Sequence, residues 1–101
     1  MTRITRKDLD QACRVLNTRA GFADTPLWRR VEDRNVATIG MFYVEGAYGG
    51  WALYQMVNDG GGVRDVFRNG FAPARELYGL MRAYMTAQED AEQAIRDGVT
   101  A

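Results

Sequence analysis

Two glycine-rich segments, residues 46–50 and 58–62, are the parts of this sequence best suited to hold a ligand. They contain six of the chain's eleven glycines. Backbone amides in such loops can converge on a phosphate, and a nearby arginine would add positive charge. The candidate ligand-binding residues are Gly49, Gly50, Gly60, Gly61, Gly62 and Arg64. One hypothesis is therefore a site for a small anionic ligand, such as a nucleotide.

The same glycines also suit tight turns between strands. Glycine reaches positive φ without steric cost, and two-residue hairpin turns require positive φ. Both segments lead into strand-like runs, and the chain has neither a GKS/GKT motif nor a GxGxxG motif before a helix. Hairpin turns are the favoured interpretation, and the anion site stays open as an alternative.

The residue types on which most catalytic sites depend are missing. The chain has no histidine and no serine, and Lys7 is its only lysine. Serine triads, Cys-His dyads, His-ligated zinc and P-loops therefore lack an essential residue. Carboxylates at Glu45, Asp59 and Asp65 could seat Mg²⁺, but acidic residues in such places are more often turn formers. We predict a non-enzymatic protein with no catalytic residue, no metal and no cofactor.

Cysteine content and charge bound the environment of the chain. Cys13 is the only cysteine, so no internal disulfide can form and a reducing compartment is expected. With no histidine to activate it, the thiol is interpreted as a small buried group. The formal net charge is zero and no apolar run is long enough to span a membrane. We expect a cytoplasmic location and no membrane partner.

A short arginine-rich segment offers a second binding hypothesis. Its candidate nucleic-acid residues are Trp28, Arg29, Arg30 and Arg34. Arginines could contact phosphates while the indole stacks on a base. Glu32 and Asp33 answer part of this charge, so a solvated loop is favoured and nucleic acid is the less favoured partner.

Capping and periodicity predict an N-terminal helix that begins after Thr5 and ends at Gly21. The Thr5 hydroxyl can accept a hydrogen bond from the Asp8 amide, and glycine is suited to a left-handed C-cap. One apolar face is formed by Leu9, Ala12, Cys13, Leu16 and Ala20. This helix is therefore expected to pack against the rest of the domain.

Three strands are predicted in the middle of the chain. Residues 23–35 lack a sustained period and are expected to form a connection with about one helical turn. β-forming residues then predict strands over residues 36–45, 51–57 and 63–67. Because each connection has about five residues, the strands are expected to form an antiparallel meander.

A last helix is predicted from Pro73 to Asp97, with Gly98 as its stop. Its interior glycine, Gly79, is expected to mark a close approach to the sheet or the first helix. The complete prediction is a single α+β domain over residues 1–101, in the order helix, three-stranded antiparallel meander, helix. Both helices are expected on one face of the sheet.

The end of the last helix is predicted to reach beyond the domain. Over residues 86–101 the apolar positions change from large to small, which allows helices to approach closely. We expect this projecting tail to pack on a second copy and form a homodimer, the alternative being a solvated tail. The candidate interface residues are Tyr48, Trp51, Ala87, Ala91, Ala94 and Ile95.

Two sequence runs, GAYGGWALYQMVNDGGGVRDVF and RELYGLMRAYM, resemble a family of small uncharacterised proteins of tailed bacteriophages. The resemblance covers about residues 36–86. It implies a phage origin and the cytoplasm of an infected bacterium, and it carries over no catalytic residue. The leading hypothesis is an accessory protein that binds a second copy of itself, or a host or virion protein.

Overall fold

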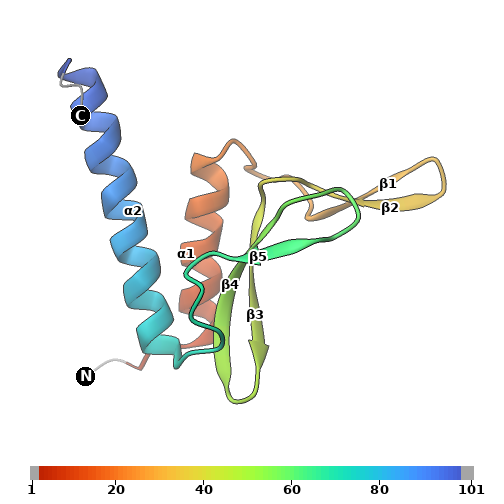
Figure 1. Cartoon of the computed structure of the whole chain (residues 1–101), viewed down its shortest axis with the longest axis horizontal. Coiled ribbons are helices and arrows are strands. Elements are labelled where there is room, and N and C mark those ends of the chain that lie inside the picture. Colours follow the sequence, from red (N-terminus) through yellow and green to blue (C-terminus); the bar gives the residue numbers. More distant parts are fainter. Residues whose placement is uncertain (1–2, 99–101) are drawn as a thin grey trace.

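The computed structural model describes residues 3–98 and has two helices and five strands (Figure 1). The elements in chain order are α1 (Arg6–Arg19), β1 (Trp28–Val31), β2 (Arg34–Ala37), β3 (Phe42–Ala47), β4 (Gly50–Met56), β5 (Val63–Asp65) and α2 (Ala74–Arg96). The predicted α+β class is confirmed. The strands form two antiparallel sheets instead of the single sheet that we expected.

The larger sheet is the predicted meander, with strand order β3-β4-β5. Val44 and Leu53 lie opposite each other in β3 and β4 and face the core. On the other side of this core are Leu9 of α1 and Leu77 of α2, both fully buried. Helices of both ends of the chain therefore cover the same face of the sheet, as Figure 1 shows.

Helix α1 begins with the capping box that its sequence predicts. The Thr5 side chain accepts from the Asp8 amide, and the Asp8 carboxylate accepts from the Thr5 amide at 2.9 Å. Gly21 follows the helix with a φ of +91°. The buried face carries four of the predicted apolar residues, Leu9, Ala12, Cys13 and Leu16, and one polar residue, Asn17. The fifth, Ala20, is instead the exposed C-cap residue.

The smaller sheet corrects the prediction for residues 23–45. Strands β1 and β2 form a hairpin, where we expected a connection with a helical turn. Its two turn residues, Glu32 and Asp33, both have positive φ, at +46° and +66°. The expected strand over residues 36–45 is divided between β2 and β3 because Gly40, with a φ of +91°, turns the chain between them.

Helix α2 has 23 residues, which gives it a length of about 35 Å. Pro73 occupies its N-cap, one position before the first-turn place that we expected, and Gly98 follows with a φ of +74°. The expectation for Gly79 was wrong, since a Cβ added there would face open space. Residues 99–101 of the predicted tail lie outside the described residues.

Two appendages extend from the body, the β1–β2 hairpin and the end of α2 (Figure 1). They raise the radius of gyration to 15.1 Å, compared with about 13 Å for a compact chain of this length. Neither α1 nor α2 is long and apolar enough to cross a membrane.

Candidate functional site

Two backbone amides of the second glycine segment already hydrogen-bond an internal side chain, that of Asn58. Asn58 Oδ1 accepts hydrogen bonds from the amides of Gly60 and Gly62 at 3.0 and 2.8 Å. The carbonyl of Gly62 accepts from the Val57 amide at 2.8 Å, which closes the loop. Because Asn58 already accepts hydrogen bonds from these two amides, the loop is a turn stabilised by its own side chain.

This loop also contacts the β1–β2 hairpin and supports it. A Cβ at Gly61 would lie 2.6 Å from the Trp28 ring, so only glycine leaves room for the indole. The Asp59 carbonyl accepts from the Ala37 amide at 2.8 Å, and its carboxylate lies 3.4 Å from the Arg34 guanidinium. Through Gly61 and Asp59, the loop predicted to bind a ligand therefore holds the β1–β2 hairpin in place.

The first glycine segment is a tight hairpin. Tyr48 and Gly49, with φ of +52° and +74°, form the two-residue turn between Ala47 and Gly50. Gly50 is buried, and a Cβ there would lie 3.0 Å from the backbone nitrogen of Ala72. The two predicted ligand residues of this segment thus have structural roles: Gly49 forms the turn, and Gly50 allows two backbone segments to approach closely.

Trp51 lies across the remaining glycine of this segment. A Cβ at Gly46 would meet the Trp51 ring at 2.6 Å. The guanidinium of Arg6, which belongs to α1, lies 5.1 Å from the centroid of the same ring. Trp51 is therefore partly buried by the chain's own residues. Arg64, the predicted cationic ligand residue, instead donates from Nε to Gln55 Oε1 at 2.8 Å.

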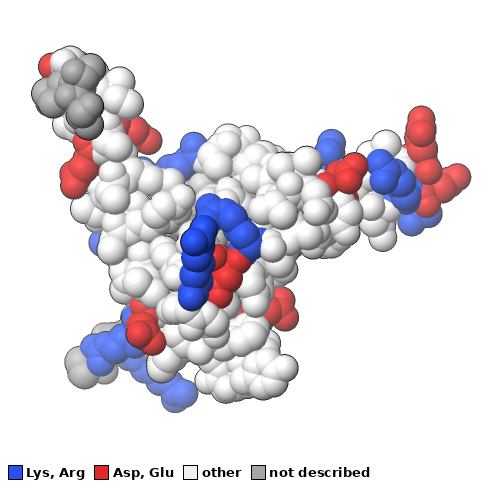
Figure 2. Space-filling model, in the orientation of Figure 1, with Lys and Arg blue, Asp and Glu red and all other residues white. Residues whose placement is uncertain are grey.

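The four candidate nucleic-acid residues all lie on the β1–β2 hairpin. Alternation along the strands places Trp28 and Arg30 on one face and Arg29 and Arg34 on the other. Acidic residues occupy the turn, and Figure 2 shows basic and acidic side chains mixed at the end of the hairpin. The structure thus separates these residues and gives them no uniformly basic surface.

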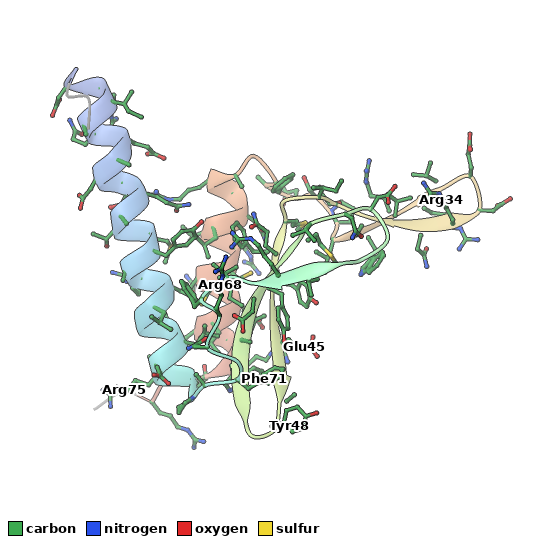
Figure 3. All side chains as sticks on the ribbon, in the orientation of Figure 1. Arg34, Glu45, Tyr48, Arg68, Phe71 and Arg75 are labelled. Atoms are coloured by element: carbon green, nitrogen blue, oxygen red, sulfur yellow. The ribbon has the colours of Figure 1, made fainter. Side chains whose placement is uncertain are left out.

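Four aromatic rings form a row on the face of the large sheet that carries no helix. Ring centroids are 5.6 Å apart for Tyr43–Tyr54, 6.3 Å for Tyr54–Phe71 and 5.6 Å for Phe71–Tyr48. Tyr48, at the end of the row, is 95% exposed. Glu45 lies on the same face and points away from the helices (Figure 3). Burial raises the pKa of Tyr43, with smaller contributions from the charges of Glu45 and Tyr54.

The sequence gives only part of the signal for this aromatic row. Tyr43 and Tyr54 belong to predicted neighbouring strands and could have been paired by alternation. Phe71 reaches the row from the segment that precedes α2, through the bridge between Ala72 and Trp51. No local sequence pattern predicts the bridge between these two residues.

The outer edge of β3 borders a groove of about 400 Å³ against α1. At one end of the groove, the buried Asn17 side chain binds the backbone of Phe42 in both directions. Its Oδ1 accepts from the Phe42 amide at 2.7 Å, and its Nδ2 donates to the Phe42 carbonyl at 2.9 Å. Cys13 also lines the groove, and its burial, helped by Asp10, raises its pKa to about 12. Its thiol is therefore protonated at neutral pH.

The end of α2 carries the remaining candidate interface residues. Ala87 and Ala91 are exposed, Ala94 is half-buried, and Ile95 is 76% exposed. Among residues 3–98, one ion pair joins this helix to α1, between Arg19 and Glu89 at 2.6 Å. Beyond that pair α2 continues for nearly two further turns, away from the body (Figure 1).

Within residues 3–98 no group of three or more His, Cys, Asp or Glu side chains is placed to hold a metal ion. Comparison of the chain with protein-family models, curated proteins and solved structures finds no match.

Proposed function

We propose that this chain is a non-enzymatic phage accessory protein that works by binding protein in the cytoplasm of an infected bacterium. Its proposed partner is a second copy of itself, with a host or virion protein as the alternative occupant of the same surface. The observation that supports this proposal is the continuation of the core-facing side of α2 beyond the body.

Leu77 and Ile95 define that side of the helix. They are 18 residues apart, which is five turns of about 3.6 residues, so their side chains leave α2 in the same direction. Leu77 is fully buried, whereas Ile95 is 76% exposed. Ala91 lies one turn before Ile95 on the same side and is also exposed. The helix thus presents a core-type surface at a point where none of residues 3–98 covers it.

A second copy could supply that cover. Small side chains such as Ala91 allow two helices to approach closely, and most soluble homo-oligomers are dimers with two-fold symmetry. The end of α2 is also one of the two appendages that raise the radius of gyration to 15.1 Å, and a second copy would bury its exposed apolar side. A homodimer formed through the ends of α2 accounts for both features.

The two alternative functions have less support. An anionic ligand would compete with Asn58 for the amides of Gly60 and Gly62. A nucleic-acid surface on the hairpin would include the acidic turn Glu32-Asp33, which repels phosphates.

Sedimentation velocity of two matched variants tests the proposal. Ile95→Glu places a charge on the core-type side of α2, and Gln93→Glu places the same charge on the opposite side. We expect the native chain and Gln93→Glu to sediment as dimers and Ile95→Glu to sediment as a monomer. A native chain that stays at its monomer mass of 11.4 kDa at every concentration would contradict the homodimer.

A further inference from the structure

The outer edge of β3 has unused backbone hydrogen-bonding groups. In an antiparallel ladder, the residues of one strand point their N–H and C=O groups alternately toward the partner strand and away from it. The two-residue turn closes with Ala47 and Gly50 as a hydrogen-bonded pair, so Gly46, Val44 and Phe42 must point their groups away from β4.

The contacts of Trp51 and Phe42 support this alternation. Trp51, the partner of Gly46, exchanges both of its backbone hydrogen bonds with Ala72 on the far side of β4, at 2.8 and 2.9 Å. Phe42 directs its N–H and C=O to Asn17. Asn17 therefore acts as a side-chain substitute for a neighbouring strand at one position of the edge.

Val44 and Gly46 have no such substitute. Within residues 3–98, no group hydrogen-bonds the outward N–H or C=O of either residue. Unpaired groups on an edge strand are a template for the addition of another strand. The edge next to the groove is therefore able to accept a short extended segment.

The lining of the groove determines which side chains of such a segment could face α1. Its volume of about 400 Å³ lies within the range of roughly 300–1,000 Å³ found for ligand clefts. Arg14 in its wall has no ion pair among the described residues, and Arg6 lies 3.5 Å from Asp10. The wall also contains Asp24, so its two arginines and two aspartates balance in charge. Because the wall has no net charge and Val44 and Cys13 line its interior, inward positions suit small apolar side chains.

The face of the sheet that carries no helix determines which side chains suit the outward positions of the segment, those that point away from α1. Glu45 is exposed and has no ion pair among the described residues. The ring of Tyr43 is on the same face, two residues away along β3. A lysine or arginine placed beside Glu45 would pair with the carboxylate and lie near that ring. Charge complementarity thus selects basic residues for the outward positions.

A second copy of this chain is a poor occupant of this edge. Two β3 strands that use both Val44 and Gly46 in an antiparallel, two-fold pairing must centre on Glu45. The two Glu45 carboxylates would then face each other directly, and like charges in that position destabilise the pairing. Glu45 therefore disfavours the edge-to-edge association of copies.

We propose that the edge of β3 is a docking site for an extended segment of another protein, which adds as a strand beside Val44 and Gly46. The segment alternates small apolar residues, which face α1, with basic residues, which face Glu45. This site is separate from the end of α2, so its failure would leave the proposed self-association untouched.

A short capped peptide in which lysine alternates with valine tests the proposal against the full chain by NMR titration. We expect the backbone amide signals of Val44 and Gly46 to shift on binding and their hydrogen exchange to slow. N-methylation of the peptide's valine amides, which face β3, should abolish these effects. N-methylation of its lysine amides, which face away, should leave the effects in place.

A charge exchange at Glu45 completes the test. In Glu45→Lys, affinity for the lysine peptide should fall about fivefold, and a peptide with glutamate in place of lysine should become the better ligand. The same substitution at an exposed acidic residue of α2, Asp90→Lys, should change neither affinity.

Three results would overturn the proposal. One is the absence of shifts at Val44 and Gly46 at millimolar peptide. Another is equal binding of the peptide that carries N-methylated valines. The third is concentration-dependent protection of these two amides in the free protein, which would assign the edge to a second copy.

Discussion

The Asn17 side chain and the Phe42 backbone form a two-way hydrogen-bonded pair between α1 and the outer strand of the sheet. The two bonds measure 2.7 and 2.9 Å and join residues that are 25 positions apart. Both residues are buried, at 8% and 4% exposure. This pair fixes α1 against β3 and limits the open part of the edge to the residues that follow.

Removal of the Asn17 amide should therefore destabilise the fold. Asn17→Ala leaves a buried N–H and a buried C=O of Phe42 without partners, which should lower the free energy of unfolding by about 3 kcal/mol. Urea denaturation measures the loss. Asn69→Ala, at an exposed asparagine, is the control and should change stability little. A loss for Asn17→Ala as small as that of the control would show that the pair is not important for stability.

Two adjacent glycines should respond differently to the same substitution. Gly61→Ala forces a side chain into the Trp28 ring at a φ of +96°, and we expect it to destabilise the protein by about 2 kcal/mol. Gly60→Ala meets only Asn58 Oδ1, at 3.5 Å, and should be nearly neutral. Thermal unfolding and Trp28 fluorescence compare the variants. Equal effects of the two substitutions would show that the contact between Gly61 and Trp28 is not important for stability.

Gly79→Ala should stabilise α2. Gly79 is exposed inside the helix, and an added Cβ meets nothing within 4 Å. Alanine lowers the entropy of the unfolded chain, so the free energy of unfolding should rise by about 0.5–1 kcal/mol. A decrease, measured by urea denaturation, would mean that Gly79 lies in a contact that the isolated chain does not make.

Cys13 should make the protein sensitive to alkaline pH. Its thiol has a pKa of about 12 in the fold, compared with the ordinary value of 9.0. Between these values the unfolded chain loses a proton that the folded chain keeps, so stability is retained below pH 9 and falls as the pH rises. The expected slope is about 1.4 kcal/mol for each pH unit.

The contribution of Cys13 is the difference between the native chain and Cys13→Ala in urea denaturation at a series of pH values. Cys13→Ala should lose stability more slowly above pH 9, since only the other groups still titrate. The raised pKa of Tyr43 acts in the same direction in both proteins and cancels in the comparison. Parallel pH profiles would contradict the prediction.

The sequence predicts those elements whose signals are local. Thr5 and Asp8 are three residues apart and make a capping box, so the start of α1 was predictable. The β1–β2 hairpin was missed because Glu32 and Asp33 replace the asparagine and glycine that usually mark a turn with two positive φ values. The following strand was predicted too long because the turn at Gly40 lies inside a run of β-forming residues.

The glycine segments show why the candidate sites were harder to predict than the elements. Gly46 is needed beneath Trp51, and Gly61 is needed beneath Trp28, which lies 33 positions earlier in the chain. Such contacts depend on how the sheets pack and have no signature within the segment itself. The open edge of β3 likewise depends on the place of β3 in the sheet and on Asn17, which the helix pattern places on the buried face without naming its partner.

Hydrogen exchange at the end of α2 is the most direct test of self-association. In an isolated copy, the amides of residues 90–96 belong to a helix end without tertiary cover and should exchange quickly, whereas those around Met81 should be protected. We expect residues 90–96 to be protected in concentrated protein and to lose this protection on dilution, while the amides around Met81 do not change. Fast exchange of residues 90–96 at every concentration would contradict it.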